Sequence, residues 1–253
     1  GGWLVKSRIS KMFKARELRL QRDMKEHARF SQIKRKKILV AGSSGLIGTQ
    51  LVAFLDTGGH DVWRLVRRPS KKGFKELSWN PDEGVIDSSE IEGFDVVIHL
   101  GGENIGDKRW SKKRKAAIVG SRRDSTTLLS DTISNLSQKP EAFLVASAIG
   151  FYGNRGDEVL TEESTQGEGF LSETVIQWES YADSAREAGI RVINTRHGIV
   201  LSAAGGALGR MLLPWKLGGG GPLAGGKQWM SWISLDDDIY AIHHLIMNGE
   251  CEG

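Results

Sequence analysis

The sequence predicts an α/β protein in which a doubly wound, mostly parallel sheet lies between two layers of helices. Strand-like and helix-like segments alternate along the chain after residue 37, as a parallel sheet requires. The chain has 253 residues, of which 39% are hydrophobic, and this is enough for one large domain with a substantial core. Before that domain, we expect an amphipathic helix that ends near His27.

Residues 1–37 differ in charge from the rest of the chain. They hold 13 Lys and Arg against 3 Asp and Glu, whereas the whole chain has a net charge of +4, so the remainder is acidic. A basic amphipathic helix can lie on a membrane surface or on nucleic acid. We favour a plainer interpretation, in which residues 1–36 are a helical extension or the end of a preceding domain. We expect no nucleic-acid partner.

The first strand is expected at Ile38–Ala41, and a glycine loop follows it. Apolar residues then recur at helical spacing, and strand, glycine turn and helix together form the setting of a dinucleotide-binding loop. The spacing is G-x-x-G-x-x-G, so a bare structural turn is the alternative. The residues expected to hold a cofactor here are Gly42, Ser43, Ser44, Gly45, Leu46, Ile47 and Gly48.

Each glycine of this loop has an expected task. Gly42 permits the tight turn, Gly45 lets the backbone approach a pyrophosphate, and Gly48 lets the helix lie close to the strand. The free amides and the positive end of the helix dipole would then face the phosphates.

The second strand, expected at His60–Val66, indicates which dinucleotide binds. An acidic residue commonly ends this strand in NAD-binding units, but here Arg67 and Arg68 take that place. A guanidinium pairs well with a 2′-phosphate and cannot accept a hydrogen bond from a ribose hydroxyl. The arginines therefore favour NADP over NAD, with two solvated arginines before a turn as the alternative.

Further strands and helices follow in alternation, and a glycine-rich, irregular stretch is expected at 212–232. The chain ends at Gly253, where another strand would be expected, so the sheet of a domain spanning 37–253 looks cut. The remaining elements are expected as strand Phe94–Leu100, a helix from about Ser111 to Leu136, strand Phe143–Ser147, helix Ser172–Ala188, strand Arg191–Arg196 and helix Asp237–Met247.

Several classes of site are excluded by composition and spacing. The single cysteine, Cys251, allows neither an intrachain disulfide nor a cysteine metal cluster, which suits a cytoplasmic protein. No apolar run approaches the ~20 residues of a membrane span, and we expect no signal peptide, because lysine and arginine interrupt the first apolar residues. The six histidines lack metal-ligand spacing, and His243 and His244 would point to different faces of a helix, so no metal site is expected.

A set of motifs spread over about residues 37–250 carries a family resemblance. The chain resembles the atypical, extended-type short-chain dehydrogenase/reductase superfamily, and more closely its nucleoside-diphosphate-sugar epimerase-like branch. The matching residues include Gly42-x-x-Gly45-x-x-Gly48, Leu100-Gly101-Gly102-Glu103-Asn104, Ser147-Ala148-x-Gly150-Phe151-Tyr152-Gly153, Trp178-Glu179, Arg196-x-Gly198-x-Val200-Leu201 and Gln228-Trp229-Met230-Ser231-Trp232.

The resemblance implies a three-layer Rossmann-type domain with NADP at the carboxyl ends of its strands. Leu100, Gly101 and Gly102 would pass beneath the ribose and pyrophosphate, where side chains would collide with the cofactor. Arg122 and Arg196 are implied to be contacts of the cofactor or of a substrate phosphate, with surface ion pairs as the alternative.

The resemblance also bears on domains and partners. Relatives usually continue into a small C-terminal domain, which would complete the substrate pocket, and some carry a START-like lipid-binding domain in front that ends in a helix similar to residues 1–36. A small-molecule substrate of unidentified class and a second copy of the chain in a homodimer are the other candidate partners.

The chain departs from the superfamily at the catalytic residues. Short-chain dehydrogenases use a Tyr-x-x-x-Lys pair to move a proton, but the corresponding positions fall near Phe170 and Thr174. Ser147 stands where the supporting serine belongs, and we expect its hydroxyl to face the nicotinamide. Tyr152 is a candidate substitute acid, with a packed loop tyrosine as the alternative.

Two classes of function remain open from these residues. One is an NADP-dependent oxidoreductase or epimerase with a degenerate Tyr-Lys site, in which Ser147 and Tyr152 are the candidate catalytic residues. The other is an NADP-binding sensor or assembly protein without turnover. Hydride chemistry belongs to the cofactor, so an altered proton relay need not abolish it.

Overall fold

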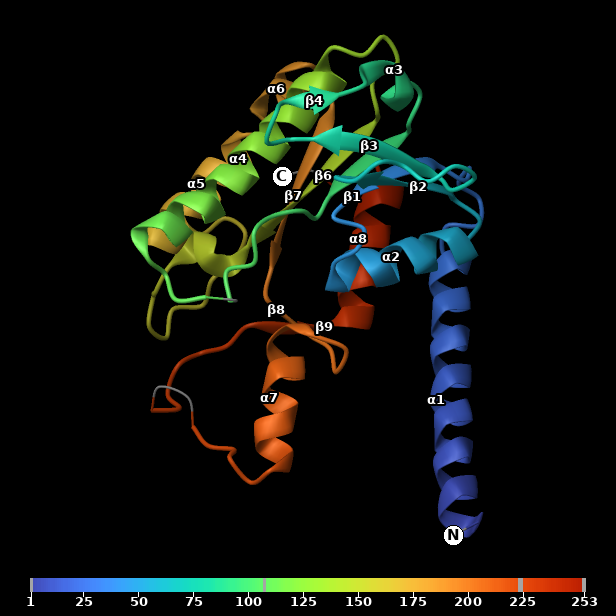
Figure 1. The fold of residues 1–253 in the computed structure, drawn as a ribbon, viewed down its shortest axis with the longest axis vertical. Coiled ribbons are helices and arrows are strands. Elements are labelled where there is room, and N and C mark those ends of the chain that lie inside the picture. Colours follow the sequence, from blue (N-terminus) through green and yellow to red (C-terminus); the bar gives the residue numbers. More distant parts are fainter. Residues whose placement is uncertain (1, 107, 223–224, 252–253) are drawn as a thin grey trace.

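A computed structural model describes residues 2–106, 108–222 and 225–251. Seven strands form a central sheet in the order β4-β3-β2-β1-β5-β6-β7 (Figure 1). Neighbouring strands are parallel except at one edge, where β4 runs antiparallel to β3. The strands are β1 (Lys37–Ala41), β2 (Asp61–Val66), β3 (Glu76–Asn80), β4 (Val85–Ile86), β5 (Val96–His99), β6 (Ala142–Ala148) and β7 (Arg191–His197).

The strand order places a crevice beside β1. The chain moves outward from β1 to β2 and β3, and then returns to the other side of β1 at β5. Ligands of such sheets bind where the order reverses, outside the carboxyl ends of the strands. The doubly wound Rossmann-type sheet predicted from the sequence is confirmed.

Helices cover both faces of the sheet. Side chains alternate along β1, so Leu39 and Ala41 join one buried cluster while Ile38 and Val40 join the other. The first cluster is covered by α4 (Lys112–Ser134), α5 (Phe170–Ser180) and α6 (Asp183–Glu187), and the second by α2 (Leu46–Thr57) and α8 (Leu235–Met247). The short helix α3 (Ser88–Ile91) precedes β5.

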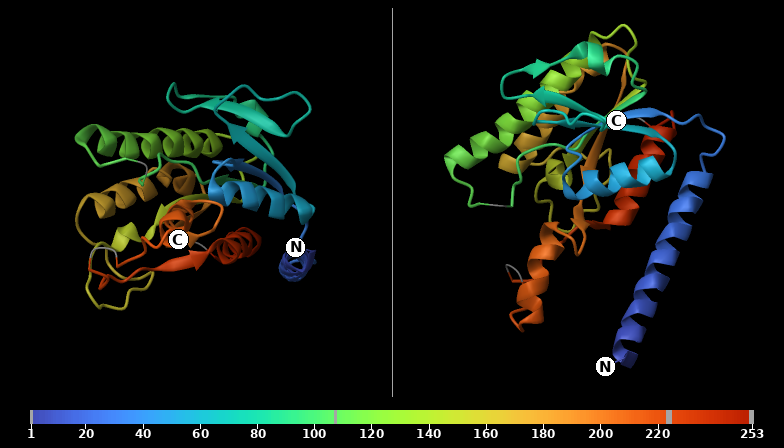
Figure 2. Two further views of the ribbon diagram at one scale, coloured as in Figure 1. Left: turned by 60° about the horizontal axis from the view of Figure 1, so that its bottom comes forward. Right: turned by 45° about the vertical axis from the view of Figure 1, so that its right-hand side comes forward.

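Helix α1 (Gly2–Ala28) projects away from this body, and only its C-terminal end lies beside other elements (Figures 1 and 2). The Arg19 guanidinium pairs with the Asp236 carboxylate of α8 at 2.9 Å, and the Tyr240 hydroxyl donates to Asp23 at 2.7 Å. Apolar side chains farther along α1 are exposed, including Trp3, Met12 and Phe13. The N-terminal helix predicted from the sequence is confirmed. None of the described helices combines the length and the apolar character that a membrane crossing needs.

The single helix expected at Ser172–Ala188 is wrong, because the chain forms α5 and α6 with a break between them. The amide of Ala185 donates to the Ser130 hydroxyl of α4 at 3.0 Å instead of to the preceding turn of its own helix. The Ser130 and Ser184 hydroxyls also bond at 2.7 Å. This docking against α4 interrupts the helix, and a sequence window cannot show it.

The irregular stretch expected from residue 212 is also wrong in its first turn. Helix α7 (Gly206–Lys216) continues through Leu212 to Lys216 and includes Pro214. None of the side chains of α7 is buried, and Leu213 and Trp215 are exposed. Next to α7, strands β8 (Ile199–Leu201) and β9 (Trp232–Ser234) form a separate parallel pair (Figure 1).

Candidate cofactor and substrate site

The glycine loop between β1 and α2 has the geometry that a phosphate-binding turn needs. Gly42 has φ of +79°, and a Cβ there would lie 2.7 Å from the amide nitrogen of Gly101. A Cβ on Gly48 would lie only 2.3 Å from the Gly42 carbonyl oxygen. Gly42 therefore makes the turn and lies against the segment just after β5, while Gly48 lets α2 pack directly on the loop.

The amino end of α2 is open to an anion. Gly45 is its N-cap residue, and no side chain of the described residues caps the helix. Ser44 and Gly45 are exposed, whereas Ser43 is buried. The first-turn amides, including those of Leu46 and Ile47, thus have free hydrogens beside a helix dipole, which is the arrangement that receives phosphate. These residues fit a dinucleotide pyrophosphate.

The two arginines after β2 differ in their surroundings. Arg68 donates to both carboxylate oxygens of Glu76, at 2.8 and 2.6 Å. Hydrogen bonding to Arg68 lowers the pKa of Glu76 to about 2. Arg67 is exposed, and its side chain has no hydrogen bond or ion pair to any described residue. Arg68 is thus held by the protein, whereas the Arg67 side chain is open to solvent.

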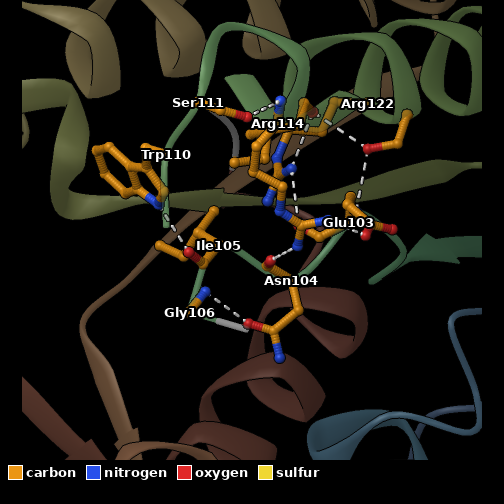
Figure 3. A network of polar contacts seen from close by, with 10 residues as sticks. Glu103, Asn104, Ile105, Gly106, Trp110, Ser111, Arg114 and Arg122 are labelled. Atoms are coloured by element: carbon orange, nitrogen blue, oxygen red, sulfur yellow. Dashed lines mark hydrogen bonds and ion pairs between the residues drawn. The ribbon is translucent and has the colours of Figure 1, made fainter. Parts of the chain in front are cut away.

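The loop after β5 is held by arginines of α4 (Figure 3). Arg122 donates to the carbonyl oxygens of Glu103 at 3.1 Å and Ile118 at 3.0 Å, and its guanidinium lies 4.5 Å from the ring centroid of Trp178. Burial lowers its pKa to about 10. A Cβ on Gly102 would lie 3.3 Å from Cζ of Arg122. Arg122 therefore supports the backbone of the loop from below.

Other contacts complete this network. Arg114 pairs with the Glu103 carboxylate and donates to the Asn104 carbonyl oxygen (Figure 3). The Trp110 indole donates to the carbonyl oxygen of Ile105 at 2.8 Å. Leu100 packs against both buried clusters, and a Cβ on Gly101 would lie 2.8 Å from the His99 ring. A Cβ on Gly101 would thus collide with the buried His99 ring, whereas one on Gly102 would need only a small shift of the Arg122 side chain.

The predicted catalytic residues meet at the ends of β6 and β7. The Ser147 hydroxyl donates to the Glu179 carboxylate of α5 at 2.5 Å, and Ser147 is only 4% exposed. Arg196 pairs with both oxygens of the same carboxylate at 2.9 Å, and donates to the Tyr152 hydroxyl at 3.1 Å. The Arg196 guanidinium also lies 3.5 Å from the ring centroid of Phe151.

This network differs from the expectation for Ser147, whose hydroxyl faces Glu179 instead of open space. The hydrogen bond to Glu179 raises the pKa of Arg196, so its guanidinium stays charged. Glu179 joins Ser147, Arg196 and Tyr152, and site prediction from the sequence left it out. Its signal was the Trp178-Glu179 motif of the resemblance.

A cavity of about 740 Å³ opens beside the edge strand β7, between the 149–162 segment, β9 and α8, and Tyr152 and Arg196 are among its lining residues. His197 is one of the polar residues that line it: Nδ1 lies 2.7 Å from the Asp238 carboxylate, and Nε2 lies 2.9 Å from the Thr195 hydroxyl. Asp238 is 3% exposed, and one of its oxygens has no partner among the described residues, as is true of the Asn194 amide oxygen. His197 and Asp238 were not among the predicted site residues, because 41 residues separate them along the chain.

The positions of the usual Tyr-Lys pair are occupied by groups with structural contacts. The Thr174 hydroxyl donates to the Phe170 carbonyl oxygen at 2.6 Å, within α5. The Phe170 ring packs edge-on against Trp110, with 5.5 Å between centroids, and Lys115 Nζ lies 4.5 Å from its centroid. Neither residue supplies an acid, so any proton transfer would depend on other groups, of which His197 and Tyr152 line the cavity.

Comparison with known proteins agrees with this geometry. The sequence model of the NAD dependent epimerase/dehydratase family matches residues 38–252. Epimerase family protein Mb2239 of Mycobacterium bovis is 39% identical over 216 residues, which cover 85% of this chain and 71% of that protein. The human epimerase family protein SDR39U1 is 33% identical over 220 residues, covering 86% of this chain and 72% of the human protein.

Two solved structures extend the comparison. The nucleoside-diphosphate sugar epimerase from Corynebacterium glutamicum superposes with a TM-score of 0.85 at 36% identity, covering 96% of this chain. This chain spans about half, 51%, of the length of that protein. Human SDR39U1, solved with NADPH, superposes with a TM-score of 0.74 at 32% identity, covering 85% of this chain and 72% of the human one.

Proposed function

Since the chain belongs to the NAD dependent epimerase/dehydratase family, we propose that it binds NADP(H) and uses it in an oxidoreductase or epimerase reaction on a small molecule. The observation that carries the cofactor choice is the exposed Arg67 at the end of β2, near the uncapped amino end of α2. The human relative solved with NADPH supports the same choice.

Different residues of this chain would bind different parts of the cofactor. The amides of Leu46, Ile47 and Gly48 would receive the pyrophosphate, and Arg67 the 2′-phosphate. Arg68 would act indirectly, because its pair with Glu76 fixes the loop that carries Arg67. When bound, the cofactor supplies a hydride donor or acceptor at its nicotinamide ring.

A cofactor titration tests the proposal. Calorimetry of NADPH and NADH with the wild-type chain should show tighter binding of NADPH. A charge-assisted contact is worth about 1.5–3 kcal/mol, so Arg67→Ala should weaken NADPH binding by roughly tenfold to a hundredfold and leave NADH binding nearly unchanged. Arg68→Ala is the matched control and should weaken NADPH binding less. Equal affinities of the wild type for both cofactors would contradict the choice of NADP.

The cavity beside β7 is proposed to receive the substrate, with His197 as the group that exchanges a proton. Asp238 would orient the imidazole through its hydrogen bond to Nδ1, and the unpartnered oxygens of Asn194 and Asp238 would accept hydrogen bonds from substrate hydroxyls. Ser147 and Arg196 would set the shape of the neighbouring strand ends through Glu179. Tyr152 contributes its ring to the same cavity.

A second candidate function, NADP binding without turnover, is favoured by the engagement of Ser147 with Glu179 and by the absence of an acid at Phe170 and Thr174. To distinguish the two, NADPH carrying deuterium at nicotinamide C4 is incubated with the protein and a metabolite extract, and labelled products are sought by mass spectrometry. If the chain is an enzyme, the wild type should transfer the label to a product. His197→Gln should then transfer it at least tenfold more slowly while its affinity for NADPH is unchanged. If the wild type transfers no label, the enzyme candidate is contradicted and NADP binding without turnover is the function that stands.

A further inference from the structure

Three histidines from distant parts of the chain meet where α1 reaches the body of the protein. His27 lies in the last turn of α1, His60 directly precedes β2, and His243 lies in α8. One ring nitrogen from each lies within 4.8 Å of those of the other two. The centroid of the His243 ring is 5.1 Å from that of His27 and 5.8 Å from that of His60. We name these residues the histidine cluster.

The histidine cluster is buried and short of hydrogen-bond partners. His243 is fully buried, and neither of its ring nitrogens bonds to a described residue. His60 is 3% exposed and its Nε2 has no partner, and Nδ1 of His27 also has none. Buried nitrogens without partners cost free energy, so a group that binds all three rings at once would relieve that cost.

The rings are also in the form that binds a cation. Burial lowers the pKa of His60 to about 4 and that of His243 to about 3, and it also lowers the pKa of His27. At neutral pH each imidazole therefore keeps one nitrogen lone pair. The surroundings also fix the protonated nitrogen of His27. Its Nε2–H donates to the Phe54 carbonyl oxygen at 3.1 Å, so the lone pair lies on Nδ1 and is available to the cluster.

Packing positions the His27 ring in this place. The ring stacks on Phe54 with 4.1 Å between centroids, and a Cβ on Gly58 would lie 2.2 Å from its Cε1. Phe30 and Phe54 also contact the His243 ring edge-on, at 5.1 and 5.2 Å between centroids. Aromatic walls of this kind exclude water and make nitrogen ligands the dominant polar groups of the cluster.

From this geometry, we propose that His27, His60 and His243 bind a divalent transition metal, with Zn²⁺ as the best match, and that the metal fastens the end of α1 to the domain. Imidazole nitrogen suits zinc, which takes four ligands in a tetrahedron at about 2.0–2.1 Å. Three such nitrogens lie about 3.4 Å apart in that geometry. The rings would therefore move together by roughly an ångström, and a water would take the fourth place.

Two groups next to the histidine cluster, the Lys36 amide and the Arg35 side chain, oppose metal binding. The Lys36 amide donates to Nδ1 of His60 at 3.2 Å, so coordination through Nε2 would move the remaining ring proton to Nδ1 and displace this bond. Arg35 brings a positive charge close to all three rings. The other charged and titratable neighbours are Asp23 and Glu26 beside His27, Lys36 beside His60, and His244 beside His243.

The test uses the full chain without a histidine tag, stripped with a chelator and titrated with Zn²⁺ by calorimetry. We expect one Zn²⁺ per chain and a rise in the melting temperature. His27→Gln, at the partly exposed end of α1, should weaken Zn²⁺ binding at least tenfold, and His243→Gln should do the same if it folds. His244→Gln is the matched control, one position away on α8, and should bind Zn²⁺ like the wild type.

Two further measurements keep the proposal falsifiable if a buried variant fails to fold. Co²⁺ should bind in place of Zn²⁺ with the visible absorption of a tetrahedral nitrogen site, and Arg35→Gln should tighten Zn²⁺ binding several-fold. The proposal is overturned if the wild type takes up no stoichiometric Zn²⁺, if His27→Gln binds it as tightly as His244→Gln does, or if Arg35→Gln leaves the affinity unchanged. Zn²⁺ with no effect on melting would overturn the fastening of α1.

Discussion

At the scale of single residues, the arginines at the carboxyl edge of this sheet differ in whether they hydrogen bond to other protein groups. Arg68, Arg122 and Arg196 have protein partners: Glu76, the loop after β5, and Glu179. Arg67 has none among the described residues and faces solvent. Because residue type alone does not distinguish these arginines, their contacts decide which of them is available to a ligand.

The pair of Arg68 and Glu76 predicts a pH-dependent contribution to stability. The pKa of Glu76 is about 2 in the folded chain, below its ordinary value of about 4.3, so the pair stabilises the fold fully above pH 4.3. That contribution is lost as the pH falls from there through 2. Arg68→Ala should therefore be less stable than wild type at pH 7, and the difference should shrink as the pH approaches 2.

Urea unfolding of both chains at several pH values measures this difference. Arg67→Ala serves as the control, since it removes an exposed arginine without an ion pair and should leave the stability close to that of wild type. A gap between wild type and Arg68→Ala that stayed constant from pH 7 to pH 2 would show that Glu76 is not the group responsible.

At the scale of elements, the glycines in the turn from β1 to α2 serve two purposes: some allow close backbone packing, and others keep the helix amides accessible to a ligand. Gly48 is needed for packing, since a Cβ there would meet the Gly42 carbonyl oxygen at 2.3 Å. A Cβ on Gly45 would lie 3.3 Å from the same oxygen, and Gly45 has an ordinary φ of −72°. The same glycine-to-alanine change should thus have different consequences at the two positions.

Gly48→Ala should lower the free energy of unfolding by about 1–3 kcal/mol or prevent folding, because backbone atoms cannot move aside at low cost. Gly45→Ala should cost less than about 1 kcal/mol, since alanine is a poorer N-cap than glycine, and should weaken NADPH binding more than tenfold by filling the approach to the helix amides. Circular dichroism and cofactor titration on the same samples measure both effects. Unchanged NADPH binding in Gly45→Ala would show that the phosphates lie elsewhere.

At the scale of the whole molecule, α1 is the element least integrated with the domain. It carries exposed apolar side chains along most of its length, and its contacts with the body lie between Arg19 and His27 (Figure 2). The Corynebacterium structure matches 96% of this chain, a coverage that requires part of the 27-residue α1. Part of α1 therefore lies within the region that matches that longer protein, and the assignment of 1–36 to the end of a preceding domain stays a prediction.

Gly58→Ala tests how α1 is held. The new methyl group would occupy the place of the His27 ring, whereas the backbone of Gly58 is in an ordinary helical conformation with φ of −74°. We expect faster amide hydrogen exchange and faster trypsin cleavage between residues 20 and 36, with little change in the exchange of β1, β5 and β6. The control is Gly221→Ala, at an exposed glycine where a Cβ would meet open space and no positive φ opposes alanine; it should leave α1 unaffected. If α1 exchanged its amide hydrogens equally slowly in both variants, the contact of His27 with Gly58 would not be what holds α1 to the domain.

Much of this protein follows from local sequence. Strands β1, β2, β5, β6 and β7, the glycine turn and the helix after it were predictable because backbone conformation, alternation of apolar residues and helix periodicity act over a few neighbours. Strands β3, β4, β8 and β9 were not among the expected elements. Arg67 and Arg68 were placed correctly at the end of β2 for the same reason. The NADP preference, the catalytic roles of Ser147 and Tyr152, and the domain boundaries remain predictions that cofactor titration and activity measurements have to decide.

Tertiary structure alone decided which side chains meet. The break between α5 and α6 depends on Ser130 of α4, the engagement of Ser147 depends on Glu179, and the cavity wall depends on Asp238 facing His197. The histidine cluster joins residues up to 216 positions apart, so the spacing rule that led us to expect no metal site could not apply to it. Contacts between distant segments depend on how helices dock on the sheet, and that docking is a property of the folded chain as a whole.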